Sequence, residues 1–155
     1  MKLIVVAAGT RLPEWVNTGF DDYAGRLTRD YRLELKEIAL GQRASGATAQ
    51  AIVKEGEKML AAIPSGSYVV ALQVGGRSLS SEQLAQFLQA RARDGRDVVF
   101  CIGGPEGLAP AVDDRADMKW SLSALTLPHG LARVMVAEAL YRAVSINKGH
   151  PYHRA

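Results

Sequence analysis

The sequence lacks several features that would assign it to a specialised class. No apolar run approaches the ~20 residues needed to cross a bilayer, and the N-terminal MKLIVVAAGT has neither a long apolar region nor a cleavage site, so we expect a strand there and not a signal peptide. The single cysteine, Cys101, excludes an internal disulfide and lies within an apolar run. We therefore expect a soluble cytoplasmic protein with a buried thiol.

Charge and metal-binding residues are also sparse. Lysine and arginine exceed aspartate and glutamate by only three, and no Lys/Arg tract occurs. This mild excess permits an anionic partner without requiring one. Aromatic residues make up 6% of the chain, too few for a prominent base-stacking platform. With three histidines and one cysteine, no convincing metal-ligand spacing exists, and we expect no metal.

The pattern of apolar residues predicts one α/β domain. A length of 155 residues fits a single domain spanning 1–155. Continuous apolar runs predict doubly covered strands, and an alternating segment predicts a half-exposed edge strand; these are 3–8, 68–74 and 97–104, and 32–38. Three- and four-residue spacing predicts helices near 12–27, 52–63, 80–94, 109–117 and from 128 onward. Such alternation indicates a mainly parallel sheet flanked by helices.

Several local features carry more specific expectations. Ser80 and Gln83 form a capping-box pattern at a helix start. The segment 41–50 is small and polar, so we expect it to be mobile, and Trp120 is expected in the core. The first and last helices are expected to bury their larger apolar residues: Leu12, Trp15, Val16, Phe20, Tyr23 and Leu27 in one, and Leu131, Val134, Met135, Leu140, Tyr141 and Val144 in the other.

The glycine-rich IGGPEG at 102–107 does not fit the common phosphate motifs. A P-loop requires Lys-Ser/Thr after its last glycine, where this chain has Leu108-Ala109, and the spacing of Gly103, Gly104 and Gly107 differs from a dinucleotide fingerprint. Two alternatives stay open. The motif is a tight strand-to-helix turn, or it is a loop whose backbone binds a neutral or cationic ligand. Two other turn-rich strand ends, LQVGGRS and LTLPHG, favour a site at the carboxyl edge of the sheet.

Three segments carry a family resemblance that covers essentially the whole chain. IGGPEG at 102–107, WSLSALTLPHGLARVMVAEALYRA at 120–143 and HPYHR at 150–154 resemble the small SPOUT-class methyltransferases, and more narrowly the RlmH family. The resemblance implies a SPOUT-type sheet with a C-terminal deep trefoil knot, bound S-adenosylmethionine and a homodimer. It also implies methylation of N3 of a pseudouridine in large-subunit (23S) ribosomal RNA, with the ribosome as partner.

The resemblance further implies the site residues. The cofactor positions carried over from the family are Leu72, Gly103, Gly104, Leu122, Ser123, Ala124, Leu125, Thr126 and Leu127. His129 is either a base, or a group that orients one, or a hydrogen-bonding residue at a helix start. The tail residues Tyr152, His153 and Arg154 would order against the partner's cofactor loop and hold the target base, whereas without the resemblance five terminal residues would be expected to fray.

Other residues keep more than one interpretation. Glu138 and Arg142 are spaced to pair on one helix face, as a structural ion pair or near the substrate. Arg77 is a solvated charge or an RNA contact, and Glu106 has no assigned role. Gly130 stands where the resemblance implies proline or another bulkier residue, and we expect it to loosen the helix start. Two rival functions remain: a SPOUT enzyme acting on another RNA nucleotide, and a non-catalytic ribosome-binding factor.

Overall fold

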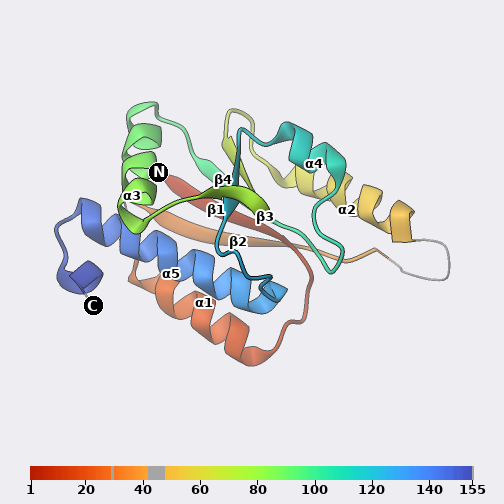
Figure 1. Ribbon diagram of the computed structural model, residues 1–155, viewed down its shortest axis with the longest axis horizontal. Helices are drawn as coiled ribbons and strands as arrows, with labels where there is room; N and C mark the ends of the chain where they lie inside the picture. Colours follow the sequence, from red (N-terminus) through yellow and green to blue (C-terminus); the bar gives the residue numbers. More distant parts are fainter. Residues whose placement is uncertain (29, 42–47, 155) are drawn as a thin grey trace.

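A computed structural model describes residues 1–28, 30–41 and 48–154. Within this part of the chain, five strands form one sheet in the order β2-β1-β4-β3-β5, and every neighbouring pair is parallel (Figure 1). The α/β fold expected from the alternation of strands and helices is therefore confirmed. The strands are β1 (Lys2–Ala8), β2 (Arg32–Ile38), β3 (Tyr68–Ser78), β4 (Val98–Ile102) and β5 (Met118–Ser121).

Helices cover both faces of the sheet. One layer holds α1, α3 and α5, and the opposite layer holds α2 and α4 (Figure 1). A core of buried side chains lies between the sheet and each layer. The helices are α1 (Glu14–Arg26), α2 (Thr48–Ala62), α3 (Ser81–Arg93), α4 (Pro110–Arg115) and α5 (His129–Asn147), followed by the short 3₁₀ helix η1 (Pro151–Arg154).

The burial of β4 and β2 agrees with their sequence patterns. β4 is buried at every position, as its continuous apolar run predicts for a strand covered on both faces. β2 lies at the sheet edge and is only partly buried, which confirms the interpretation of its alternating pattern. Trp120 and Cys101 are both buried, and burial raises the pKa of the Cys101 thiol to about 12.

One strand end differs from the sequence expectation. β3 does not end at Gly75 but continues to Ser78, because Arg77 and Ser78 pair again with β5 after a register shift. β5 ends at Ser121, and residues 122–127 form the loop that precedes α5. Of the segment expected to be mobile, 42–47 lies outside the described residues, and 48–50 opens α2.

The expected buried faces of α1 and α5 are partly wrong. Trp15 is 56% exposed. In α5, Leu140 and Val144 are buried as expected, whereas Leu131, Val134, Met135 and Tyr141 are not. The helix turns a row of small residues and one arginine toward the sheet instead: Ala132, Arg133, Val136, Ala137, Leu140, Ala143 and Val144. Because α5 carries apolar residues on nearly all sides, the size of a residue does not mark the buried face.

No helix within the described ranges is both long enough and apolar enough to span a membrane.

Candidate functional site

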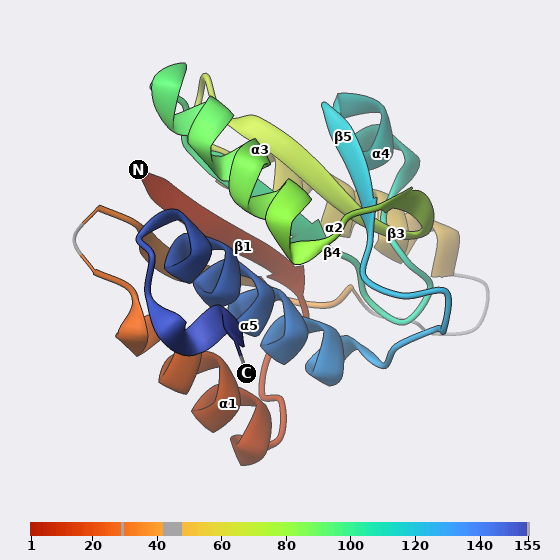
Figure 2. The ribbon, with the colours of Figure 1, turned by 60° about the vertical axis from the view of Figure 1, so that its left-hand side comes forward.

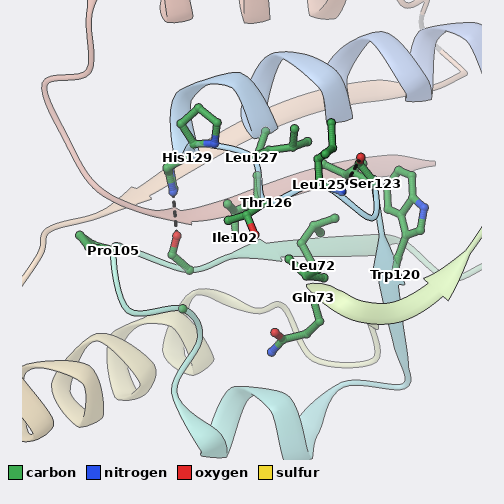
Figure 3. Close-up of a pocket in the computed structure, with 17 residues that line it drawn as sticks. Leu72, Gln73, Ile102, Pro105, Trp120, Ser123, Leu125, Thr126, Leu127 and His129 are labelled. Carbon is green, nitrogen blue, oxygen red and sulfur yellow. Dashed lines mark hydrogen bonds between the residues drawn. The ribbon is translucent and has the colours of Figure 1, made fainter.

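A cavity of about 430 Å³ opens at the carboxyl edge of the sheet, where three loops meet (Figure 3). Its walls come from the middle of β3, from the loop after β4 and from the loop that joins β5 to α5. Open α/β sheets bind ligands at this edge. The convergence predicted from the three turn-rich segments is thus present in the fold.

The loop after β4 is folded tightly on itself. Gly107 N–H donates to the Gly104 carbonyl at 2.9 Å, and Gly107 has a φ of +87°, a conformation that favours glycine. A Cβ on Gly103 would lie 2.4 Å from the carbonyl carbon of Gly107, which leaves no room for a side chain. Gly103 and Gly104 nevertheless line the cavity. The tight turn and the ligand loop are therefore compatible interpretations of one segment.

The loop between β5 and α5 forms the opposite wall. The Ser121 hydroxyl donates to the Ser123 carbonyl at 2.9 Å, and the Leu125 N–H donates to the Ser123 hydroxyl at 3.0 Å, so two serines fix its shape. Leu125 is 73% exposed at the cavity. Of the nine predicted cofactor positions, the cavity is lined by eight: Leu72, Gly103, Gly104, Leu122, Ser123, Leu125, Thr126 and Leu127. Ala124 is not among the lining residues.

The third wall comes from an irregularity in β3 that the sequence did not reveal. Leu72 and Arg77 both pair with Trp120 of β5, so the residues between them leave the ladder and bring Gln73 and Val74 to the cavity. The Gln73 amide donates to Asp113 of α4 at 2.9 Å. This bond fixes the bulge against the neighbouring layer.

His129 begins α5 at the rim of the cavity and makes two hydrogen bonds with its ring. Nδ1 lies 2.7 Å from the Gly103 carbonyl oxygen, and Nε2 lies 2.8 Å from Nε of Arg133. A carbonyl only accepts and an arginine only donates, so Nδ1 carries the proton and Nε2 accepts. Burial lowers the pKa of His129, and the Arg133 charge lowers it further, against the raising effect of the Gly103 carbonyl.

Arg133 is the site residue that sequence reasoning missed. Its side chain is 0% exposed, and its other donors bind Glu37 Oε2 at 2.6 Å and the Gly9 carbonyl at 2.7 Å. The available signal was an arginine inside an otherwise apolar stretch, since buried arginines require partners.

The tail residues lie away from this cavity. η1 folds back beside the end of α5 and toward α1 (Figure 2). The Tyr152 ring contacts that of Tyr141 at 4.6 Å, with Arg142 4.9 Å from its centroid. Burial raises the pKa of Tyr152 to about 12, and a hydrogen bond with Tyr23 adds to the shift. Tyr141 lies twelve residues beyond His129 on α5, or about 18 Å at 1.5 Å per residue.

The predicted pair of Glu138 and Arg142 is present, at 2.8 Å between Oε1 and Nε. Both residues border a second cavity of about 360 Å³, which shares Trp120 and Leu122 with the cavity at the carboxyl edge of the sheet. Arg77 is exposed. No group of three or more potential metal ligands was found in the described part of the chain.

The cavity has the properties of a small-molecule site. Its volume lies in the ~300–1,000 Å³ range of such sites, and apolar side chains and glycines line it. A parallel α/β sheet with such a cavity at its carboxyl edge defines a class of ligand-binding proteins. The particular family follows from the sequence: the family described as "Predicted SPOUT methyltransferase" matches residues 1–153. This chain belongs to the SPOUT methyltransferase family.

A solved structure supports the fold. The chain is similar to a methylase family protein from Neisseria gonorrhoeae, with a TM-score of 0.54 and 10% sequence identity. The match covers 90% of this chain and 81% of the other. At this identity the likeness concerns the fold alone.

Proposed function

We propose that this SPOUT methyltransferase transfers a methyl group from S-adenosylmethionine to N3 of a pseudouridine in 23S ribosomal RNA, acting as a homodimer on the assembled ribosome. Family membership supports the enzyme class, because SPOUT methyltransferases generally use this cofactor. The substrate rests on the narrower resemblance to the RlmH family, including its HPYHR tail at 150–154. The trefoil knot implied by that resemblance is part of the proposal.

One observation carries the proposal: the two most family-specific loops form opposite walls of the same cavity. IGGPEG contributes Gly103 and Gly104, and SLSALTLPH contributes Leu122 to His129 apart from Ala124. Gly103 keeps bare backbone at the wall, where peptide groups can hydrogen-bond an adenosyl moiety while leucines flank its ring.

The chemistry defines what the protein must do. When bound, S-adenosylmethionine supplies a methyl group on a positively charged sulfur. The loops 103–107 and 122–127 would hold the cofactor and orient it toward the target nitrogen, so catalysis would come largely from proximity and orientation. N3 of a pseudouridine carries a proton, which an acceptor must remove before or during attack.

The tail is assigned to the partner's site. Tyr152 lies beside Tyr141, about 18 Å along α5 from the cavity rim. The resemblance to the RlmH family implies that each tail orders against the cofactor loop of the other protomer in a homodimer. Tyr152 would stack on or hydrogen-bond the target base, and Arg154 would hold phosphate or stabilise a deprotonated ring.

The substrate is tested by mass spectrometry of ribosomal RNA from a deletion strain with and without this gene. We expect one pseudouridine to lose its N3-methyl group and to regain it on complementation. An unchanged pseudouridine pattern refutes the substrate, and a change at a different nucleotide identifies a SPOUT enzyme of other specificity. Calorimetric titration with S-adenosylmethionine addresses the remaining rival, because a non-catalytic factor would show no binding.

A further inference from the structure

We infer that His129 is not the proton acceptor of the transfer but a positioning residue. Arg133 holds it in one tautomer, and it in turn holds the Gly103 carbonyl. The inference rests on the proposed use of S-adenosylmethionine for two of its readouts, and a third readout is independent of that proposal.

The arrangement is a hydrogen-bonded network of five groups that crosses the carboxyl edge of the sheet. Glu37 at the end of β2 and the Gly9 carbonyl after β1 hold the guanidinium of Arg133 at 2.6 Å and 2.7 Å. Arg133 Nε donates to His129 at 2.8 Å, and His129 Nδ1 donates to Gly103 at 2.7 Å. The network thus ties the loop after β4 to two strands that precede it by more than 60 residues.

The same network removes His129 from proton transfer. Its Nε2 lone pair already accepts from a cation, and its Nδ1 already bears hydrogen. If Nε2 were protonated, its N–H would face the Nε–H of Arg133, and neither could accept a hydrogen bond from the other. The imidazolium and the guanidinium would then be two cations in contact, with Glu37 as the carboxylate beside them. The charged groups acting on the imidazole are Arg133 of α5 and Glu37 of β2, and they act in opposite directions on its pKa. A base in this position would require Arg133 to leave a fully buried site.

The positioning role follows from what Gly103 does. Its carbonyl accepts from His129, and its peptide lines the cavity. Gly103 carries no side chain of its own, and its carbonyl accepts from the imidazole, which therefore orients this peptide. Loss of the bond lets the wall relax and weakens cofactor binding before it affects the transfer step.

The first test is the tautomer itself, measured by long-range ¹H–¹⁵N correlation spectroscopy on ¹⁵N-labelled protein at pH 7. We expect a neutral His129 ring with the proton on Nδ1. In Arg133→Met the Nε2 atom loses both its donor and the neighbouring positive charge, so protonation of His129 should begin at higher pH than in the parent. An Nε2–H tautomer or an imidazolium in the parent protein at pH 7 overturns the inference.

The second test separates binding from transfer with two substitutions of His129. Asparagine places an amide N–H near the position of Nδ1, whereas leucine fills space without donating. We expect the Kd for S-adenosylmethionine to rise less than tenfold in His129→Asn and more than tenfold in His129→Leu. Single-turnover rates at saturating cofactor should stay within tenfold of the parent in both. A general base contributes about 10²–10⁴-fold, so a loss of that size in both variants, at normal Kd, identifies His129 as the acceptor and overturns the inference.

A matched control guards against simple destabilisation. Like Arg133, Arg96 donates to backbone carbonyl groups. Its partners are Gly66 and Ser67, which lie at the amino end of the strands. Arg96→Met should change the free energy of unfolding without changing the tautomer of His129 or the Kd. If the parent protein binds no S-adenosylmethionine, the proposed function fails, while the tautomer measurement still decides the role of Arg133.

Discussion

At the scale of single residues, the most costly element of the site is the charge of Arg133. Its side chain has no exposed surface. Burial of an isolated charge is strongly unfavourable, and removing one partner of a buried ion pair typically costs about 3–5 kcal/mol. Here the guanidinium is matched by one carboxylate, one carbonyl and one imidazole. Because apolar residues often replace a buried ion pair without loss of stability, we attribute Arg133 to its orientation of His129.

Gly103 gives the first prediction at this scale. In Gly103→Ala the new Cβ would meet backbone atoms of Gly107 and Leu108 at 2.4 Å and 2.5 Å, and a backbone clash cannot be relieved by a rotamer change. We expect the Kd for S-adenosylmethionine to rise at least tenfold and the free energy of unfolding to fall by about 1–3 kcal/mol. Calorimetric titration and urea denaturation measure the two effects.

The control for this substitution is Gly25→Ala in α1, where an added Cβ would meet nothing within 4 Å. Because alanine is the better helix former, this change should raise the free energy of unfolding by about 0.5–1 kcal/mol and leave the Kd unaltered. Unweakened binding in Gly103→Ala would show that the loop can open without harm to the cavity.

At the scale of elements, α1 and α5 pack closely because glycines allow it. A Cβ on Gly130 would lie 2.8 Å from Cγ2 of Val16, and one on Gly19 would lie 3.2 Å from the methyl groups of Val134. Val16 of α1 therefore packs against Gly130 of α5, and Val134 of α5 packs against Gly19 of α1. The expected bulkier residue at 130 does not fit this pairing of side chains, and Gly130 serves contact between the helices.

A double-mutant cycle tests this contact. We expect Gly130→Ala to lower the free energy of unfolding by about 1–3 kcal/mol through overpacking. Val16→Ala removes the methyl group that the new Cβ would meet, so the two changes together should cost less than their sum by at least about 0.5 kcal/mol. Urea denaturation of the four proteins measures this difference. For comparison, Val16→Ala combined with Gly25→Ala should be additive within about 0.5 kcal/mol, and an equally additive Gly130 cycle would contradict the contact.

The elements also show what sequence reasoning could and could not reach. The strands at 3–8 and 32–38 follow from local patterns, and the capping box of Ser80 and Gln83 is present. The bulge that brings Gln73 and Val74 to the cavity could not be predicted, because pairing of β3 with a strand more than 40 residues away creates it. Arg133 was missed for a related reason: its partners, Gly9 after β1 and Glu37 of β2, come from the other end of the chain.

At the scale of the whole molecule, the site and the tail are separated within one protomer. The proposed dimer makes a sharp prediction from this separation. A protein lacking residues 150–155 should bind S-adenosylmethionine and fail to methylate. The Gly103→Ala protein should have an intact tail but a cavity that binds the cofactor weakly. Coexpressed in equal amounts, the two should restore about one quarter of parental activity, because half the dimers are mixed and each has one complete site.

The control for this complementation combines the tail deletion with a protein that carries both defects, which leaves no intact tail in any dimer. Purified mixed dimers should be assayed by methyl transfer to ribosomes, and their mass should be determined by light scattering. Full activity of the tail deletion alone, or no gain in the mixed dimers, would show that the tail does not complete the partner's site.

The order of strands in the sheet also determines when each strand can pair during synthesis. β1 lies between β2 and β4, and Leu3 pairs with Val98. At about 5–20 residues per second, the ribosome needs roughly 5–20 seconds to make the 95 residues that separate them. Throughout that interval, the apolar run 3–8 has only β2 to pair with along one side. The nascent chain therefore exposes one edge of this apolar strand for seconds, and we expect chaperones to contact the N-terminus early in synthesis.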